Sequence, residues 1–478
     1  MSISTVVKGI QDIMRKDSGV DGDAQRISQM VWMIFLKVLD DKEKNFELLD
    51  DNYQSPIPDK YKWRNWAIED EGLTGDELLE FIDELFKELK NLTVTEDDRK
   101  AAIIQSAFAD TYNYMKSGTL LRQVINKINE IDFGKIEDRH IFNDIYEKIL
   151  KDLQSAGNAG EFYTPRAVTQ FIVDMVDPKL GETVFDPACG TGGFLICALQ
   201  PLRKQVKTPK DKKTLETSIF GIEKKQLPHL LSVTNMILHD VETPLIEHDN
   251  SLSTFQRSYS AKDKVDVIIT NPPFGGVEED GVESNFPQKF QTRETADLFL
   301  VLILHRLKDK GRCGIVLPDG TLFGEGVKTR IKEELLSTCN LHTIVRLPNG
   351  VFAPYTGIKT NLLFFEKGSP TKEIWFYEHP YPAGYKSYSK TKPIKIKEFK
   401  PEKKWWNSRE ENEFAWKVTL EEIQEKNYNL DFKNPHQVEE DLGDPIELLA
   451  EYKELMQDVS ATRDQLKQEL ENALRGNS

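Results

Sequence analysis

The sequence of 478 residues has few cysteines, no long apolar run and no excess of positive charge. The longest apolar stretch near its beginning, MVWMIFL (30–36), is too short to cross a bilayer, and nothing upstream resembles a signal peptide. The cysteines lack the paired spacing of metal ligands, so we expect reduced thiols, no metal centre and a cytoplasmic location. The four cysteines are Cys189, Cys197, Cys313 and Cys339.

Positive charge is scarce for a protein that handles nucleic acid unaided. Lys and Arg number 63 against 79 Asp and Glu, which gives a net charge of −16. A free-standing DNA-binding protein usually carries a basic surface. Any nucleic-acid function therefore requires a local basic groove or a partner that supplies one.

Hydrophobic periodicity divides the chain into four predicted regions. Residues 1–150 predict a helical domain, because apolar residues recur at spacings of three and four. Residues 151–370 predict an α/β domain, and residues 371–444 a lysine- and aromatic-rich extension. Residues 445–478 predict a C-terminal helix.

The α/β prediction rests on short apolar runs that alternate with helical stretches after about residue 160. This alternation is typical of a doubly wound fold, in which helices cover both faces of a parallel sheet. The predicted strands are 183–188, 218–223, the neighbourhood of 245–249, 265–270, 313–318, 342–348 and 360–366.

Two segments near the C-terminus suggest contacts with partners. Residues 381–406 mix lysines with aromatic residues, which suits contact with a nucleic-acid backbone or another subunit, although a solvated loop and hairpin would explain them equally well. The last helix carries one heptad-like apolar seam that only Arg463 interrupts, and it either packs on its own chain or docks on another subunit. The seam comprises Leu449, Tyr452, Met456, Val459, Arg463, Leu466, Leu470 and Ala473.

The segment FDPACGTGGFL (185–195) joins a predicted strand to a helix through a glycine-rich turn. Doubly wound folds receive nucleoside cofactors at such turns, since glycine lets the backbone approach the ligand closely. The segment lacks both the G-x-G-x-x-G spacing and the G-K-[ST] of a P-loop, so phosphate binding is not favoured, and Asp186 suits a cationic or zwitterionic ligand better. The other candidates in this turn are Pro187, Gly190, Thr191, Gly192 and Gly193.

Polar residues also follow the next three predicted strands. Glu223 could accept two hydrogen bonds from a ribose diol, and Asp249 could accept one from the exocyclic amine of adenine or merely form an Asx turn. Asn271 follows the fourth strand. Because the carboxyl ends of parallel strands meet at one edge, these residues and Asp186 predict a single site.

The tetrapeptide Asn271-Pro272-Pro273-Phe274 combines two hydrogen-bond acceptors with an aromatic ring. Prolines stop a strand, and this alone is the simplest explanation of the motif. The acceptors, however, are the side-chain carbonyl of Asn271 and the stiffened backbone carbonyl of Pro272, and together they match an –NH₂ group. When both N–H groups of an aromatic amine donate hydrogen bonds, the nitrogen favours a pyramidal state, and its lone pair can then attack an electrophile. The ring of Phe274 would stack on the planar ring that carries the amine.

FDPACGTGGFL followed by DVIITNPPF resembles the S-adenosyl-L-methionine-dependent adenine-N6 DNA methyltransferases. The segment GEFYTPRAVTQFIVDMV (160–176) is similar to a cofactor-capping motif in the modification subunits of type I restriction–modification systems. That resemblance implies cofactor contacts from Phe162, Tyr163, Thr164 and Pro165. TADLFL (295–300), GIVLPDGTLFG (314–324) and residues 344–365 also resemble this family, so the likeness covers essentially the whole chain.

The resemblance implies transfer of a methyl group from S-adenosyl-L-methionine to the N6 amine of an adenine flipped out of double-stranded DNA. Residues 151–370 would then be the catalytic methyltransferase domain, with Asn271, Pro272, Pro273 and Phe274 as its catalytic residues. The implied partners are a second copy of the chain, a specificity subunit that reads the DNA sequence and, in many systems, a restriction–translocation subunit. Delegated base readout would explain the acidic composition.

Two alternative functions stay open. A protein-glutamine methyltransferase uses the same tetrapeptide on a side-chain amide, but such enzymes typically have Tyr at the fourth position and lack the Phe-Tyr-Thr-Pro segment. A non-catalytic assembly subunit could retain the fold without methylating anything, although the intact tetrapeptide argues against it.

Overall fold

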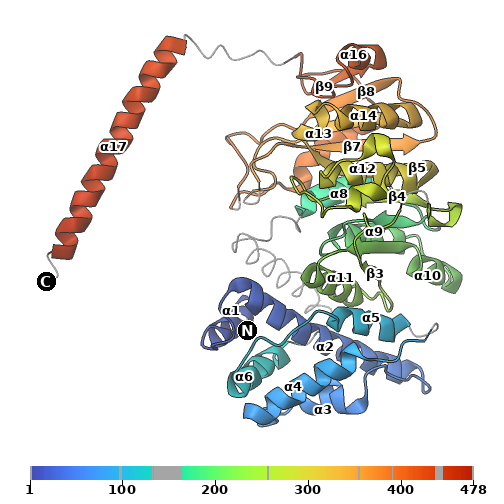
Figure 1. Ribbon diagram of the computed structural model, residues 1–478, viewed down its shortest axis with the longest axis vertical. Helices are drawn as coiled ribbons and strands as arrows, with labels where there is room; N and C mark the ends of the chain where they lie inside the picture. The colour runs from blue at the N-terminus through green and yellow to red at the C-terminus, as the bar shows by residue number, and fades with distance from the viewer. Residues whose placement is uncertain are drawn as a thin grey trace. The chain divides into compact units, whose positions relative to one another are not determined.

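The structure is a computed structural model that describes residues 3–95, 99–131, 133, 164–255, 258–353, 356–389, 391–436 and 445–475 (Figure 1). Contacts divide the chain into one unit that ends at Lys433 and a second that begins at Asn434. Each unit is described by itself.

The first part of the larger unit consists of helices, as the apolar spacing predicts. They are α1 (Ile3–Met14), α2 (Asp23–Leu49), α3 (Trp63–Trp66), α4 (Gly75–Lys90), α5 (Arg99–Phe108) and α6 (Gly118–Asn129). The run 30–36, which is too short for a membrane span, is buried inside α2. Among the described residues, no helix is both long and apolar enough to cross a membrane.

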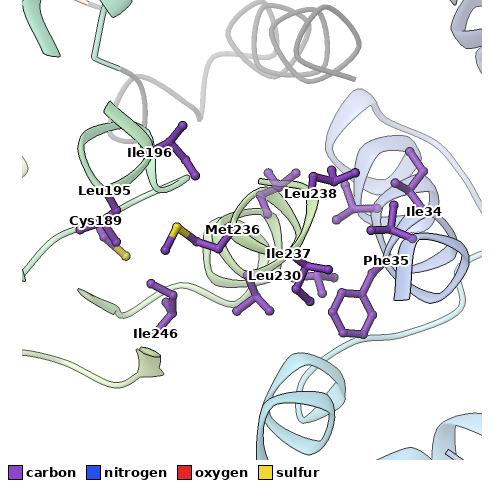
Figure 2. Close-up of a cluster of buried hydrophobic side chains, with 14 of the residues drawn as sticks. Ile34, Phe35, Cys189, Leu195, Ile196, Leu230, Met236, Ile237, Leu238 and Ile246 are labelled. Carbon is purple, nitrogen blue, oxygen red and sulfur yellow. The ribbon is translucent and has the colours of Figure 1, made fainter. Parts of the chain in front are cut away.

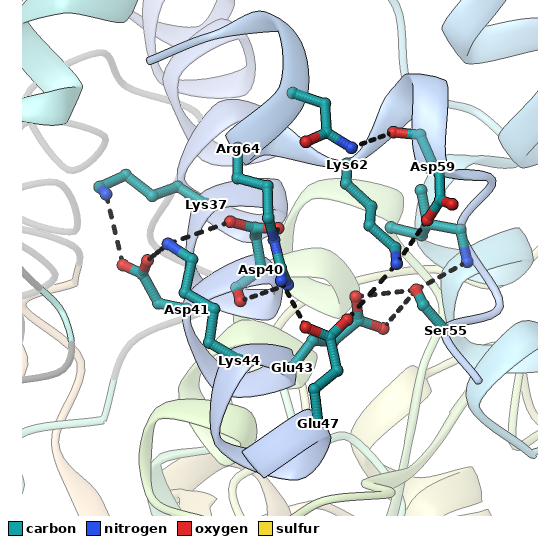
Figure 3. A network of polar contacts seen from close by, with 12 residues as sticks. Lys37, Asp40, Asp41, Glu43, Lys44, Glu47, Ser55, Asp59, Lys62 and Arg64 are labelled. Atoms are coloured by element: carbon teal, nitrogen blue, oxygen red, sulfur yellow. Dashed lines mark hydrogen bonds and ion pairs between the residues drawn. The ribbon is translucent and has the colours of Figure 1, made fainter. Parts of the chain in front are cut away.

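A polar network fastens α2 to the segment that follows it (Figure 3). Glu43 is buried and accepts hydrogen bonds from the hydroxyls of Tyr53, at 2.9 Å, and Ser55, at 2.7 Å. Burial raises the pKa of Glu43, and Lys62 and Arg64 oppose that rise. Several partners thus offset the cost of burying this carboxylate.

In the described part of the chain, nine strands form one sheet in the order β3-β2-β1-β4-β5-β7-β6-β8-β9. Strands β1 to β5 run parallel to one another. The bounds are β1 (Val184–Asp186), β2 (Ile219–Glu223), β3 (Leu245–His248), β4 (Val265–Thr270), β5 (Leu307–Pro318), β6 (Cys339–Arg346), β7 (Thr360–Lys367), β8 (Glu373–Glu378) and β9 (Ala415–Thr419).

The seven predicted strands are present, with three corrections. Strand β5 begins at Leu307 rather than near residue 313. The prediction of a parallel sheet is wrong for β7, which lies antiparallel between β5 and β6. Strands β8 and β9 were not predicted, and they extend the same sheet into the region 371–444.

Helices cover both faces of the sheet, as a doubly wound fold requires. One face is covered by the helices α8 (Arg166–Val176), α9 (Gly193–Arg203) and α11 (Gln226–Leu238). The other face is covered by α12 (Thr295–Arg306) and α14 (Val327–Thr338). Within β4, Val267 and Ile269 join the first core and Ile268 joins the second, because successive strand residues point to opposite faces. The other α-helices in the described part of this unit are α10 (Pro209–Glu216), α13 (Asp319–Phe323), α15 (Lys400–Trp406) and α16 (Leu420–Glu425).

Helix α11 also joins the sheet to the N-terminal helices (Figure 2). Its Leu230, Ile237 and Leu238 are buried in the same core as Ile34 and Phe35 of α2. The helical region and the sheet therefore share a continuous apolar core.

The lysine–aromatic stretch 381–406 packs inward. Tyr388, Phe399 and Trp405 are buried, and Tyr381, Tyr385 and Trp406 are partly buried against the same core. These rings therefore stabilise the fold, and none of them is exposed in the described part of the stretch.

The second unit contains the helix α17 (Pro445–Arg475), which matches the predicted C-terminal helix. Along its seam, several large apolar side chains are exposed in the described chain. These exposed residues are Leu449, Tyr452, Met456, Val459 and Leu466.

Candidate active site

The carboxyl ends of β1, β2, β3 and β4 lie at one edge of the sheet. Asp186 pairs in register with Gly221, and Glu223 pairs with His248. Since these strands are parallel, Asp186, Glu223 and Asn271 all lie at or just beyond the same edge. The predicted convergence of polar strand ends is therefore present.

Asp186 is a buried carboxylate with one oxygen held by the protein. Its Oδ1 accepts hydrogen bonds from the Thr270 hydroxyl, at 2.7 Å, and the Ala188 N–H, at 3.1 Å. Its Oδ2 is buried and has no hydrogen-bond partner among the described residues. Burial raises the pKa of Asp186 to about 7, and the nearby charge of Glu223 adds to the rise. The Oδ2 of this carboxylate therefore suits a hydrogen bond from a positively charged group of a ligand.

Glu223 joins the end of β2 to the glycine-rich turn. Its Oε2 accepts a hydrogen bond of 2.9 Å from the Gly190 N–H, and its Oε1 accepts one of 2.7 Å from the Lys225 N–H. The side chain is therefore fixed in place between the glycine-rich turn and the residues that follow β2.

The glycine-rich turn needs glycine at two positions for steric reasons. Gly190 and Gly192 have φ values of +54° and +79°, in the left-handed region that side chains disfavour. A Cβ on Gly192 would also lie 2.7 Å from the Ser232 hydroxyl oxygen. The turn is thereby held close to α11 before α9 begins at Gly193.

The tetrapeptide directly follows β4, and one end of the Asn271 side-chain amide is hydrogen-bonded within the protein. Its Nδ2 donates a 2.8 Å hydrogen bond to the Thr164 hydroxyl, whereas its Oδ1 is buried without a hydrogen-bond partner in the described chain. Phe274 is half-buried and meets the ring of Phe352 at 6.2 Å between centroids and 70° between planes. Gly275, with φ +66°, then turns the chain.

The other predicted site residues fall into two groups. Thr164 and Pro165 precede α8 and lie near the end of β4, whereas Phe162 and Tyr163 lie outside the described residues. Asp249 is exposed, and its Oδ1 accepts a 2.7 Å bond from the N–H of the next residue, Asn250. An Asx turn bonds two residues on, and here Asn250 forms one, since its Oδ1 accepts from the Leu252 N–H at 3.0 Å. The N–H of Asp249 donates to the carbonyl of Glu223 at 3.2 Å.

A cavity of about 210 Å³ lies at these strand ends. A larger hollow of about 780 Å³ lies beside α3 and α4, but most of its lining consists of charged side chains and it includes none of the polar strand ends. The chemistry favours the smaller cavity. Its lining includes Pro187, Ala188, Glu223, Asp249, Ser251, Asn271, Pro273, Glu278 and Thr295.

Several residues of this site were not predicted from the sequence. Thr270 holds Asp186, and the Ser251 hydroxyl donates to the Pro187 carbonyl at 2.6 Å. Glu278 accepts from the Thr295 hydroxyl at 3.1 Å and pairs with Lys224 at 3.3 Å, so the loop after the tetrapeptide is tied to the end of β2. Thr270 could have been found from the sequence, because it stands directly before Asn271 at the end of a predicted strand. No pattern in the sequence indicates that Glu278 pairs with Lys224.

The sequence model of the N-6 DNA Methylase family matches residues 137–443, and that of the HsdM N-terminal domain matches residues 3–128. The chain is 62% identical to the methylase subunit of the Escherichia coli type I restriction enzyme EcoEI, and the alignment covers 100% of this chain and 99% of that one. It is 28% identical to the EcoKI methylase subunit of E. coli strain K12, over 76% of this chain and 68% of the relative.

Solved structures agree with this similarity. A crystal structure described as a modification subunit of a type I restriction enzyme from Vibrio vulnificus YJ016 has a TM-score of 0.84 and 45% identity, and the match covers 91% of this chain and 97% of that one. A chain from a study of the assembly and conformational transition of a type I restriction–modification system has a TM-score of 0.80 and 37% identity, with 98% of both chains covered.

The nine-stranded sheet, the helical N-terminal region and the polar strand ends thus occur in a chain that aligns from end to end with such subunits. The chain belongs to the N-6 DNA methylase family and, within it, to the methylase subunits of type I restriction enzymes.

Proposed function

We propose that this chain methylates the N6 amine of an adenine in double-stranded DNA, with Asn271, Pro272, Pro273 and Phe274 as the catalytic residues. One observation carries the proposal. The Asn271 Oδ1 is a buried acceptor without a protein partner, at the edge of the sheet where the acidic strand ends converge. An acceptor in that position suits the proton of an amino group.

The donor and acceptor set fits S-adenosyl-L-methionine, which supplies a methyl group on a sulfonium when bound. The unpartnered Oδ2 of Asp186 suits the cationic amino acid end, and the fixed carboxylate of Glu223 suits the ribose diol. The glycine-rich turn would admit the cofactor close to the backbone, and Asp249 is available for the adenine amine. The cofactor-binding residues would be Phe162, Tyr163, Pro165, Asp186, Pro187, Gly190, Thr191, Gly192, Gly193, Glu223 and Asp249.

The tetrapeptide would act on the target base. The Asn271 Oδ1 and the Pro272 carbonyl would each accept a hydrogen bond from one N–H of the amine. The nitrogen lone pair is then less delocalised into the ring. Phe274 stacks on the flipped base, and Phe352 supports the ring of Phe274 from the side. Positioning and hydrogen bonding account for the chemistry without an acid–base pair or a covalent intermediate.

We further propose that the chain works in a complex with a second copy of itself and a specificity subunit, to which a restriction–translocation subunit can be added. Net charge −16 and the inward packing of the 381–406 aromatic rings favour base readout by a partner. The heptad-like apolar seam of α17 favours docking of that helix on another subunit.

The test is transfer of a labelled methyl group from the cofactor, assayed with and without the specificity subunit. The proposal expects N6-methyladenine in DNA only when the specificity subunit is present. Labelled glutamine in protein would support the alternative methyltransferase, and absence of any product from a cofactor-saturated complex would support a non-catalytic subunit. Full activity of the isolated chain on arbitrary DNA would refute the proposed partnership.

A further inference from the structure

We propose that Thr164 is a positioning residue for methyl transfer, because its hydroxyl holds the amide of Asn271 in place beside the bound base. The resemblance in sequence implies a different task for Thr164, a contact with the cofactor. The inference rests on the proposed function, since it concerns the acceptor that this function assigns to Asn271.

The two ends of the Asn271 amide have different surroundings. The Nδ2 of Asn271 donates to the Thr164 hydroxyl at 2.8 Å, and the Oδ1 on the opposite side of the amide is buried without a hydrogen-bond partner in the described chain. The donor of the amide is thus used within the protein, and its acceptor remains for a ligand. In this arrangement the end of the amide that remains for the base is an acceptor, which is what the N–H groups of an amine require.

The hydroxyl fixes where the amide lies. Without it, the Nδ2 would be left without this acceptor, and rotation of the side chain would become favourable because a buried polar group seeks a partner. The Oδ1 would then lose its fixed place at the end of β4. Even a small displacement of a group that grips a reacting atom slows the reaction strongly.

Thr164 lies just before the buried helix α8, which fixes its position. The next residue, Pro165, caps α8, and its carbonyl accepts the N–H of Val168 at 2.8 Å. Helix α8 contacts β4 and β5 and is largely buried. Thr164 therefore connects the start of a buried helix to the end of the strand that carries Asn271, which stands 107 residues later in the sequence.

The two roles of Thr164 predict different kinetic effects. A cofactor ligand changes the affinity for S-adenosyl-L-methionine, whereas a positioning residue changes the rate of transfer at saturating cofactor. Thr164→Val keeps the shape of the side chain and removes the hydroxyl, and Thr164→Ser keeps the hydroxyl. Thr169→Val is a matched control, because the Thr169 hydroxyl lies one turn further along α8 and bonds to the Arg166 carbonyl at 3.0 Å.

The experiment uses the full chain with its specificity subunit and measures single-turnover methylation, cofactor dissociation by calorimetry and thermal unfolding. We expect Thr164→Val to lower the transfer rate at least tenfold, with the cofactor Kd within threefold of that of the unaltered protein. Thr164→Ser and Thr169→Val should stay within threefold in both quantities. If Thr164→Val unfolds at a clearly lower temperature, Thr164→Ala carries the same expectation.

Three results would overturn the inference: an unchanged transfer rate in Thr164→Val, a loss explained entirely by weaker cofactor binding, or an equal loss in Thr164→Ser. Failure of the proposed function has a different signature, because the unaltered complex would then form no N6-methyladenine at all.

Discussion

The Thr270 hydroxyl donates a hydrogen bond of 2.7 Å to the carboxylate of Asp186, across the junction of two neighbouring parallel strands. Strand β4 ends in the proposed catalytic tetrapeptide, and β1 leads into the glycine-rich turn. This single bond therefore joins the strand proposed to grip the base to the strand proposed to bind the cofactor.

Thr270→Val should weaken cofactor binding at neutral pH. The substitution keeps the shape of the fully buried side chain but removes a donor that lowers the pKa of Asp186, so the carboxyl would bind its proton more tightly. Loss of a partner for a buried polar group also costs about 1–3 kcal/mol of stability. Calorimetric cofactor titration and thermal unfolding would measure both effects. Thr270→Ser, which retains the hydroxyl, is the control, and equal binding by Val and Ser would contradict the expectation.

Cofactor affinity should rise with pH up to about 7. The pKa of Asp186 is raised to about 7, and only the ionised carboxyl attracts the ammonium group of the cofactor. For one such group, affinity should increase roughly 20-fold between pH 5.5 and 7.5. Asp186→Asn should bind weakly at every pH in that range. A flat profile in the unaltered protein would show that Asp186 does not receive the cationic end.

The same carboxyl makes the opposite contribution to the stability of the cofactor-free chain. Its folded pKa lies above its ordinary value of 3.8, so the folded state retains a proton that the unfolded chain has released. The stability from this group is therefore complete below pH 4 and is lost as the pH rises through 7. We expect the increase in melting temperature caused by the cofactor to grow over the same interval, and differential scanning fluorimetry would measure it.

Asn271→Ala and Phe274→Ala should abolish most methyl transfer while cofactor affinity stays within threefold. Removal of one fixed polar group that acts on the reacting centre typically costs on the order of 10²–10³ in rate. Loss of a stacking ring weakens the grip on a base by about 1–3 kcal/mol. Leu49→Ala, at an exposed position at the end of α2, is the control and should be active. Loss of cofactor binding in both alanine variants would mean that the tetrapeptide has a different role.

Charge placed in the seam of α17 should prevent assembly without affecting the active site. Tyr452→Glu and Val459→Glu replace side chains that are 59% and 60% exposed in the described chain, so neither should destabilise it. Ala461→Glu adds the same charge on the opposite side of the helix and is the matched control. Co-purification with the specificity subunit and cofactor titration would separate assembly from binding. Deletion of residues 445–478 should have the same effect, and an unaltered complex would refute this role of the seam.

Much of the sheet could be predicted because its strands are short apolar runs between turn residues. The start of β5 was missed because LKDKG (307–311) is mostly polar. Strands β8 and β9 mix apolar with charged residues, and their environment of lysines and aromatic residues obscured them. Strand direction has no signature in periodicity, so the antiparallel course of β7 was not predicted.

The site was predictable where its residues follow strands directly. Asp186, Glu223 and Asn271 converge because parallel strands share an edge, and this follows from the order of the elements. The bond between Thr164 and Asn271 and the pairing of Glu278 with Lys224 depend on loops whose course no periodic pattern determines. Such pairs become visible only when the side chains are placed.

The antiparallel strand β7 also affects how the chain is synthesised. It lies between β5 and β6 in the sheet but follows both in the sequence, so a ribosome delivers β6 before the strand that must separate it from β5. Until Lys367 has emerged, β5 presents an unpaired edge that includes the apolar residues 313–317. A nascent chain that stalls before this point would be prone to pair with other chains, although its tetrapeptide has long been translated.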